Sequence, residues 1–237
     1  MDGLFISYMF FLRIGLICLG IFLFIRPVEA MEVKPPILEL SVAPAASTST
    51  VFLLKNTEVI PRTYAFTIQG FVAGGDGGEQ RFLPVSETAG LPSWLFVTKP
   101  RVTLQPGEEV PVPIFFRPPL EARAGGYQAV IFATVVESEA AGGVMLGSRV
   151  GVLVFARVEG EVTRKMNAVS FSQVSPRLVH RPSLKAEVIV ENQGSIHEIP
   201  QGFLSITDMF GRVVGRVSLQ EEGRPARILP NSIRKFS

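Results

Sequence analysis

The sequence has very little cysteine, histidine or tryptophan. It contains one cysteine, two histidines and one tryptophan. The cysteine, Cys18, lies in an apolar N-terminal run, so the remainder of the chain cannot depend on disulfide bonds or on a thiol nucleophile. A zinc site needs several His, Cys or carboxylate ligands at short spacing, whereas His180 stands alone and His197 has only Glu198 beside it. We therefore predict no metal and no cofactor.

The sequence also lacks a strong charge bias and the common catalytic motifs. Lys and Arg total 23 and Asp and Glu total 21, without a polybasic cluster, so we predict no nucleic-acid partner. No P-loop, dinucleotide fingerprint or Gly-x-Ser-x-Gly elbow occurs. The carboxylates of Asp76 and Glu79 supply too few oxygens for calcium, and nothing fixes a glycosidase-like separation between Glu137 and Glu139 or within Glu221-Glu222. We predict that the protein is not an enzyme.

An apolar segment opens the chain. Phe5 to Ile25 is interrupted only by Arg13, and Ile14 to Ile25 has the length of a signal-peptide core. Val28-Glu29-Ala30 then offers small residues where a signal peptidase cleaves. The alternative is an uncleaved anchor, because the run is about long enough to cross a ~30 Å bilayer. We predict that residues 1–30 are a signal peptide or membrane anchor, which places the body outside the cytoplasm, in the periplasm or at the cell surface, in association with the membrane.

The body has the pattern of an all-β protein. Hydrophobic residues make up 47% of the chain, and 22 glycines and 18 prolines separate short apolar stretches, which is typical of a sandwich or barrel. We expect a strand over Trp94 to Thr98 and a hairpin tip or loop over Gly70 to Gln80. Val110 to Ile114 alternates with Pro111 and Pro113, which predicts an edge strand or a strand with one unpaired rim.

A second unit begins after residue 158. Val188 and Val190 alternate with acidic residues and lead into an Asn192 to Gly194 turn, and Asp208 to Gly211 indicates a hairpin turn. This unit is shorter than the roughly 100 residues of an immunoglobulin-like sandwich. We predict two immunoglobulin-like β-sandwich domains, residues 31–158 and 159–237, of which the second is incomplete at its C-terminus.

Two stretches are apolar on both alternating sets, Ala129 to Val136 and Val150 to Ala156. Such strands lie centrally in a sheet or under cover, and this is the reading that we favour. An exposed edge would instead accept a partner strand through its backbone. The only candidate binding residues that the sequence offers belong to this second possibility. They are Val150, Val152, Leu153, Val154 and Phe155.

Three stretches carry a resemblance to a known family: Val51 to Asn56, Leu95 to Pro100 running into Leu104 to Glu108, and Ser148 to Arg157. Through them residues 36–158 resemble the N-terminal domain of periplasmic pilus-assembly chaperones, and Ser148 to Arg157 is similar to the last strand of that domain. The resemblance implies binding of secreted subunits by strand addition. Such chaperones hold a terminal carboxylate with an Arg in the first strand and a Lys in the last.

Here the first strand, Ile37 to Ser41, has no Arg, and the corresponding place near Leu153 is apolar. The resemblance therefore assigns no binding residues to this chain.

Three elements of the second unit carry another resemblance: Asn192-Gln193-Gly194, Phe210-Gly211 and Leu229 to Arg234. Through these elements and its overall plan, the chain resembles Gram-positive surface proteins that bind WxL-type cell-wall proteins. This resemblance implies two immunoglobulin-like domains and a C-terminal membrane helix that would follow the present sequence.

These observations leave three functional hypotheses. The first is a non-enzymatic envelope protein that binds other surface proteins or cell-wall polymer through its sandwich surfaces. The second is a chaperone of the pilus-assembly type. The third is an accessory domain of a carbohydrate-active enzyme. Contact with the membrane would run through the N-terminal segment or a missing C-terminal helix.

Overall fold

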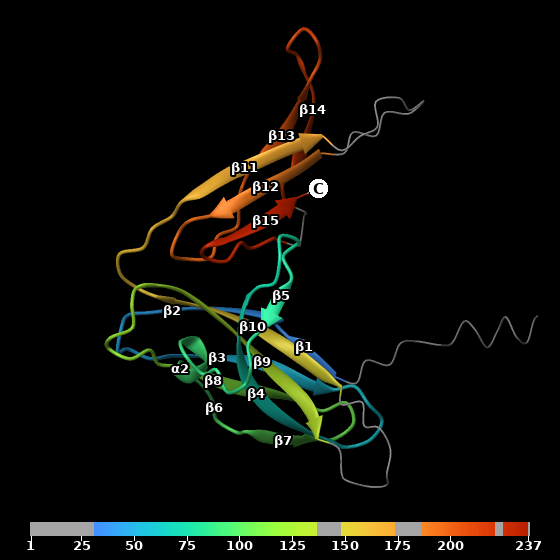
Figure 1. The fold of residues 1–237 in the computed structure, drawn as a ribbon. Coiled ribbons are helices and arrows are strands. Elements are labelled where there is room, and N and C mark those ends of the chain that lie inside the picture. The colour runs from blue at the N-terminus through green and yellow to red at the C-terminus, as the bar shows by residue number, and fades with distance from the viewer. Residues whose placement is uncertain (1–30, 137–147, 174–185, 221–224, 237) are drawn as a thin grey trace, which may run out of the picture.

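The computed structural model describes residues 31–136, 148–173, 186–220 and 225–236. These residues form β-strands joined by turns, with one short helical turn (Figure 1). The prediction of an all-β, immunoglobulin-like fold is confirmed. The predicted signal peptide or anchor, residues 1–30, lies outside the described residues, as do Glu137, Glu139 and His180.

Two sheets pack face to face in the part of the chain up to residue 158, which we call the first unit. One sheet has the strand order β1-β3-β8-β6. Its strands are β1 (Met31–Lys34), β3 (Thr48–Asn56), β8 (Glu109–Phe116) and β6 (Leu95–Val97). The other has the order β2-β10-β9-β4-β5, with β7 also paired to β4. Its strands are β2 (Ile37–Val42), β10 (Arg149–Val158), β9 (Gly125–Val136), β4 (Arg62–Ala73), β5 (Gln80–Phe82) and β7 (Arg101–Leu104).

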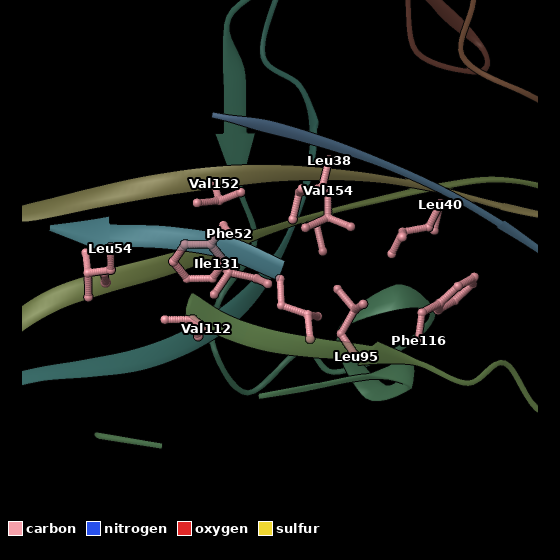
Figure 2. Close-up of a cluster of buried hydrophobic side chains, with 14 of the residues drawn as sticks. Leu38, Leu40, Phe52, Leu54, Leu95, Val112, Phe116, Ile131, Val152 and Val154 are labelled. Atoms are coloured by element: carbon pink, nitrogen blue, oxygen red, sulfur yellow. The ribbon is translucent and has the colours of Figure 1, made fainter. Parts of the chain in front are cut away.

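The core of the first unit lies between these sheets. Alternate residues of each strand point inward, as the period of two requires. Figure 2 shows leucine, valine, isoleucine and phenylalanine side chains from both sheets meeting in this layer. Phe52, Leu54, Ile131 and Val154 are at most 1% exposed. Burial of such side chains contributes about 1.5–3 kcal/mol each, so this layer dominates the stability of the unit.

The remaining strands form two smaller sheets, which we call the second unit. One has the order β11-β12-β15, and the other is the hairpin β13-β14. The strands are β11 (Met166–Gln173), β12 (Ala186–Asn192), β15 (Ser232–Phe236), β13 (Phe203–Thr207) and β14 (Val213–Ser218). The hairpin turn predicted at Asp208 to Gly211 is confirmed, since Gly211 N donates to Asp208 O at 3.0 Å.

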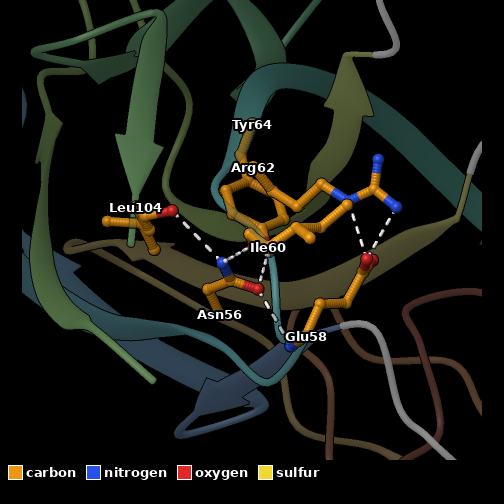
Figure 3. A network of polar contacts seen from close by, with 6 residues as sticks. All are labelled: Asn56, Glu58, Ile60, Arg62, Tyr64 and Leu104. Carbon is orange, nitrogen blue, oxygen red and sulfur yellow. Dashed lines mark hydrogen bonds and ion pairs between the residues drawn. The ribbon is translucent and has the colours of Figure 1, made fainter. Parts of the chain in front are cut away.

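A buried asparagine closes the turn after β3. Asn56 is fully buried, and its Nδ2 donates to Ile60 O at 2.8 Å and to Leu104 O at 3.1 Å. Its Oδ1 accepts hydrogen bonds from Glu58 N at 3.0 Å and from the Tyr64 hydroxyl at 3.1 Å (Figure 3). The amide thus ties three separate segments of the first unit together.

The second unit repeats this arrangement at Asn192. Its Nδ2 donates to Ile196 O at 2.8 Å and to Ile228 O at 3.0 Å, and its Oδ1 accepts from Gly194 N at 2.8 Å. Like Asn56, Asn192 is fully buried. The same side-chain chemistry at the end of β3 and of β12 indicates that the two units share this part of their architecture.

Two predicted segments have different bounds in the structure. The strand predicted over Trp94 to Thr98 is present as β6 (Leu95–Val97), whereas Trp94 itself ends a helical turn, α2 (Leu91–Trp94), that follows Gly90. The loop predicted from Gly70 is shorter than expected. β4 continues to Ala73 because Phe71 is buried, and only the glycine-rich tip lies outside the strands.

The proline-bearing strand β8 agrees with the sequence. It pairs with β3 along its whole length, whereas β6 pairs only with Ile114 to Phe116. Among the described residues, no strand pairs with the other rim of β8 between Glu109 and Pro113. The predicted unpaired rim is therefore present.

Candidate functional site

A second apolar cluster lies on the outer face of the β2-β10-β9-β4 sheet. It consists of Phe71, Val130, Phe132, Phe155 and Leu229. Leu229 belongs to the second unit, so this cluster joins the two units. It also explains why β9 and β10 are apolar on both faces. One face meets the sandwich core, and the other is covered by Phe82 of β5 and by Leu229 of the second unit, as expected for a strand that is apolar on both faces.

Aromatic rings form a continuous series across this face. Phe132 contacts Phe82 at a centroid distance of 5.1 Å, Phe82 contacts Phe71 at 6.4 Å, and Phe71 contacts Phe155 at 5.9 Å. All three pairs are edge-to-face, the geometry that the ring quadrupoles favour. At one end of the series the Arg149 guanidinium lies 4.3 Å from the Phe132 ring centroid.

A cavity of about 370 Å³ opens between this face and the second unit. Leu153 and Phe155 of β10 and Ile37 of β2 form part of its wall. Segments 225–229 and 232–234 of the second unit, together with the β4-β5 hairpin, form the rest. The cavity therefore exists only because the two units pack together.

Two arginines of the second unit border the cavity. Arg227 forms an ion pair with Glu39 of β2 at 2.5 Å, and its guanidinium lies 5.4 Å from the Phe155 ring centroid. Arg234 Nη1 donates to the backbone oxygen of Arg227 at 3.0 Å. The cavity thus combines an apolar floor with cationic groups at its second-unit wall.

His197 of the second unit also contacts Phe155. The ring centroids are 4.7 Å apart. Burial lowers the pKa of His197 below its usual 6.5; Arg227 lowers it as well, whereas Glu39 and Glu198 act in the opposite direction. The neutral imidazole is therefore the form that suits this contact between the units.

The first four residues of β10 are open on one side. Leu153 to Val158 pair with β9 on one side and with β2 on the other. Arg149 to Val152 pair with β9 only, and among the described residues no strand pairs with their other side. Leu153 N donates to Pro36 O, so by the alternation along a strand the N–H and C=O groups of Arg149 and Gly151 point to the open side.

The sequence-predicted binding residues divide between three environments. Val152 and Val154 are buried in the sandwich core. Leu153 and Phe155 face the cavity. Val150 packs partly on the core beside the open rim. The favoured expectation of a central strand fits Leu153 to Phe155, whereas the edge alternative fits only the residues before them.

Sequence reasoning missed the part of this region that comes from the second unit. Arg227, Arg234 and His197 approach β10 only through the packing of the two units, and no local pattern in the sequence reports it. The covered outer face of β9, by contrast, had a signal in the unbroken apolar run at Ala129 to Val136.

The described residues show no group of three or more His, Cys, Asp or Glu side chains that could hold a metal ion. Within the same residues, no helix is both long enough and apolar enough to cross a membrane. What the site does offer is a backbone edge, an aromatic face and an apolar cavity with cations. This combination suits binding of an extended polypeptide.

No protein-family model matches the sequence, and no curated protein matches it. Solved structures do resemble it. A chain from a chaperone–tip adhesin complex of CFA/I fimbriae biogenesis aligns with a TM-score of 0.53 and 11% identity, over 87% of this chain and 85% of that one. The class 5 fimbriae chaperone CfaA aligns with a TM-score of 0.50 and 11% identity, over 86% and 83% of the two chains. At this identity the likeness concerns the fold, and this chain has the immunoglobulin-like β-fold of fimbrial chaperones.

Proposed function

We propose that the protein is an extracytoplasmic, non-enzymatic chaperone that holds an envelope or surface subunit by strand addition to β10. The observation that carries this proposal is the open rim at Arg149 to Val152, which leads directly into the cavity at Leu153. The resemblance in fold to fimbrial chaperones supports the same function. Of the hypotheses from the sequence, these findings favour the chaperone over the general surface-binding protein.

The rim supplies the backbone groups that strand addition needs. Arg149 and Gly151 each present an N–H and a C=O to the open side. Four residues of strand extend about 13 Å at ~3.3 Å per residue, so this rim accepts a short segment of partner strand. Its backbone hydrogen bonds give affinity without requiring a particular sequence.

The side chains next to the rim favour an apolar partner. On the inner face, Val150 and Val152 continue the sandwich core. On the outer face, Phe132 leans over Gly151, where an added Cβ would lie 3.1 Å from its ring. A partner strand would therefore place apolar side chains on both sides of the sheet.

The far end of the rim fixes where the partner leaves the sheet. β2 occupies the position beside β10 from Ile37 onward. A partner that follows the rim toward Leu153 must leave the sheet there and enter the cavity between the units. The apolar floor suits a hydrophobic segment better than the hydroxyl-rich surface of a cell-wall polymer, which needs several convergent polar groups.

The proposal retains the predicted export and domain division. Residues 1–30 would direct the chain out of the cytoplasm, and domains 31–158 and 159–237 would form the two walls of the cavity. The apolar Phe5 to Ile25 segment supports the first statement. The cluster shared by Phe155 and Leu229 supports the second.

Photo-crosslinking in cells tests the proposal. A benzophenone amino acid at position 149 should crosslink to an exported protein that aggregates when expressed alone and stays soluble with this chain. The same probe at position 49, on exposed β3, should give no such product. Crosslinking to wall polymer from position 149, or to no protein at all, would refute strand addition.

A matched pair of variants separates backbone from side chain. Arg149→Pro removes the outward N–H without removing a donor to β9, whereas Arg149→Ala keeps it. Because a net hydrogen bond contributes about 0.5–1.5 kcal/mol, we expect Arg149→Pro to weaken capture up to roughly tenfold relative to Arg149→Ala. Equal capture by the two variants would contradict a role for this rim.

A further inference from the structure

The β4-β5 hairpin reaches from the first unit to the second. Its last residue pair is Ala73 with Gln80, and Gly74 N donates to Glu79 O at 2.8 Å. Beyond this pair the tip, Gly74 to Glu79, leaves the sheet and meets β15 (Figure 1). There Lys235 N donates to Asp76 O at 2.5 Å. The tip is thus a contact between the units that is separate from the covalent link after Val158.

Gly78 is the second point of contact. Its φ is +89°, a backbone conformation that glycine adopts without strain, and a Cβ built on it would meet the Arg234 guanidinium, which would have to shift. Arg234 in turn donates to Arg227 O, and Arg227 pairs with Glu39 of β2. A continuous set of contacts therefore runs from the tip across the second unit to the floor of the cavity.

The same tip forms a wall of the cavity. Gly75, Gly78 and Glu79 line it from the hairpin, and Arg227 and Arg234 line it from the second unit. The base of the hairpin is held firmly, because Phe71 and Phe82 belong to the aromatic series. The tip contributes backbone contacts and almost no apolar burial, so its hold on β15 is weak compared with its base.

We propose that the tip is a latch that closes the cavity by holding β15, and that a partner segment enters the cavity when the latch releases. The second half of this statement rests on the proposed function, whereas the first does not. The latch is one backbone hydrogen bond and one glycine contact. Its release should increase the accessibility of the cavity by about two- to tenfold, the factor that corresponds to one net hydrogen bond.

A thiol reporter tests the closure. In a Cys18→Ser background, Ala226→Cys places a single thiol on the cavity wall. Gly74 to Glu79 is then replaced by Asn-Gly, the two-residue turn that joins paired strand ends, which keeps the Ala73–Gln80 pair and deletes the tip. We expect N-ethylmaleimide to alkylate the cavity thiol about two- to tenfold faster in the shortened hairpin.

Ser49→Cys, on exposed β3, is the matched control in both backgrounds. Its alkylation rate should not change when the tip is shortened. An unchanged rate at position 226, or a rate that already equals that of position 49 with the full tip, would overturn the latch. Equal urea midpoints for the full and shortened hairpins would show that faster alkylation is not caused by unfolding.

A reversible crosslink tests the connection with partner entry. The Lys235–Asp76 hydrogen bond brings the two backbones to a separation that a disulfide can span, so Asp76→Cys with Lys235→Cys, in the Cys18→Ser background, fixes the tip to β15 when oxidised. Benzophenone crosslinking from position 149 should fall at least fivefold in the oxidised protein and recover on reduction. Equal crosslinking from position 149 in the oxidised and reduced proteins would refute the gating role and would leave the proposed function standing. Failure of capture in the protein with its native tip would refute the proposed function, and the alkylation result would still decide the latch.

Discussion

Replacing Asn56 with alanine should destabilise the first unit strongly. The side chain makes four hydrogen bonds, to Ile60 O, Leu104 O, Glu58 N and the Tyr64 hydroxyl. Each is worth about 0.5–1.5 kcal/mol net, so their sum lies between ~2 and ~6 kcal/mol. Because the site is fully buried, water cannot replace the lost amide, and we expect a loss near ~4 kcal/mol.

The single tryptophan makes the effect measurable in one unit. Trp94 packs against the core of the first unit, 4.6 Å from the Tyr127 ring centroid, so its fluorescence follows the unfolding of that unit. With a urea m-value of about 2 kcal/mol per M, the Asn56→Ala midpoint should fall by ~2 M. Circular dichroism in the same titration follows both units.

Asn192→Ala is the matched control, since it removes three equivalent hydrogen bonds in the second unit. It should shift a transition seen by circular dichroism and leave the Trp94 transition within ~0.5 M of the unmodified protein. A shift below ~0.5 M for Asn56→Ala would refute the value assigned to the amide. An equal Trp94 shift for both variants would show that the two units unfold as one.

Three further outcomes are expected. Burial lowers the pKa of His197. Below pH 6.5 the unfolded chain therefore binds a proton that the folded chain does not, so the stability of the folded state falls as the pH falls. His197→Gln should reduce the difference in urea midpoint between pH 7.5 and 5.5. Gly126→Ala would put a Cβ 2.9 Å from Ile196 Cα, so it should separate the units and increase the radius of gyration measured by X-ray scattering. Phe155→Ala removes a buried ring from both the aromatic series and the cavity floor, and we expect a loss of about 3 kcal/mol in urea unfolding.

The sequence predicts the fold well where side-chain pattern alone decides it. The alternation in β12 and the turn at Asn192 agree with the structure. The run of β9, apolar on both faces, is buried on both faces, as the favoured reading predicts. The strand predicted from Trp94 begins one residue too early, because an apolar aromatic residue before a strand resembles part of the strand, whereas Trp94 ends a helical turn. The extra length of β4 depends on Phe71 finding a partner in Phe155, which is a tertiary contact.

The candidate site is predictable only in part. The sequence singles out the stretch from Val150 to Phe155 as a candidate, yet it cannot say at which residue pairing with β2 begins. That boundary decides which backbone groups are free. The cations of the cavity wall, Arg227 and Arg234, come from a segment whose position depends on how the units pack, so no spacing along the chain could have placed them beside β10.

The origin of the open rim can nevertheless be traced to a dipeptide. If the first strand continued along β10 in the register of Leu153 with Ile37, Pro35 would lie beside Gly151, and proline has no N–H to donate. The chain instead crosses to the other sheet, where Val33 pairs with Leu54. Pro35 and Pro36 therefore mark the end of the pairing between β2 and β10. The rim of β10 before Leu153 is left without a partner strand among the described residues.

The partly open rims of β8 and β10 differ in their backbone donors, and the difference favours a binding role for the rim of β10. On β8, Glu108 O accepts from Asn56 N, so by alternation the nitrogens of Pro111 and Pro113 point to the unpaired side. That rim has no N–H at either proline and resists strand addition, as edges usually must. On β10 the corresponding side keeps the N–H groups of Arg149 and Gly151. Prolines close one edge to a partner strand, whereas the other keeps its donors beside an apolar cavity, as a strand-addition site requires.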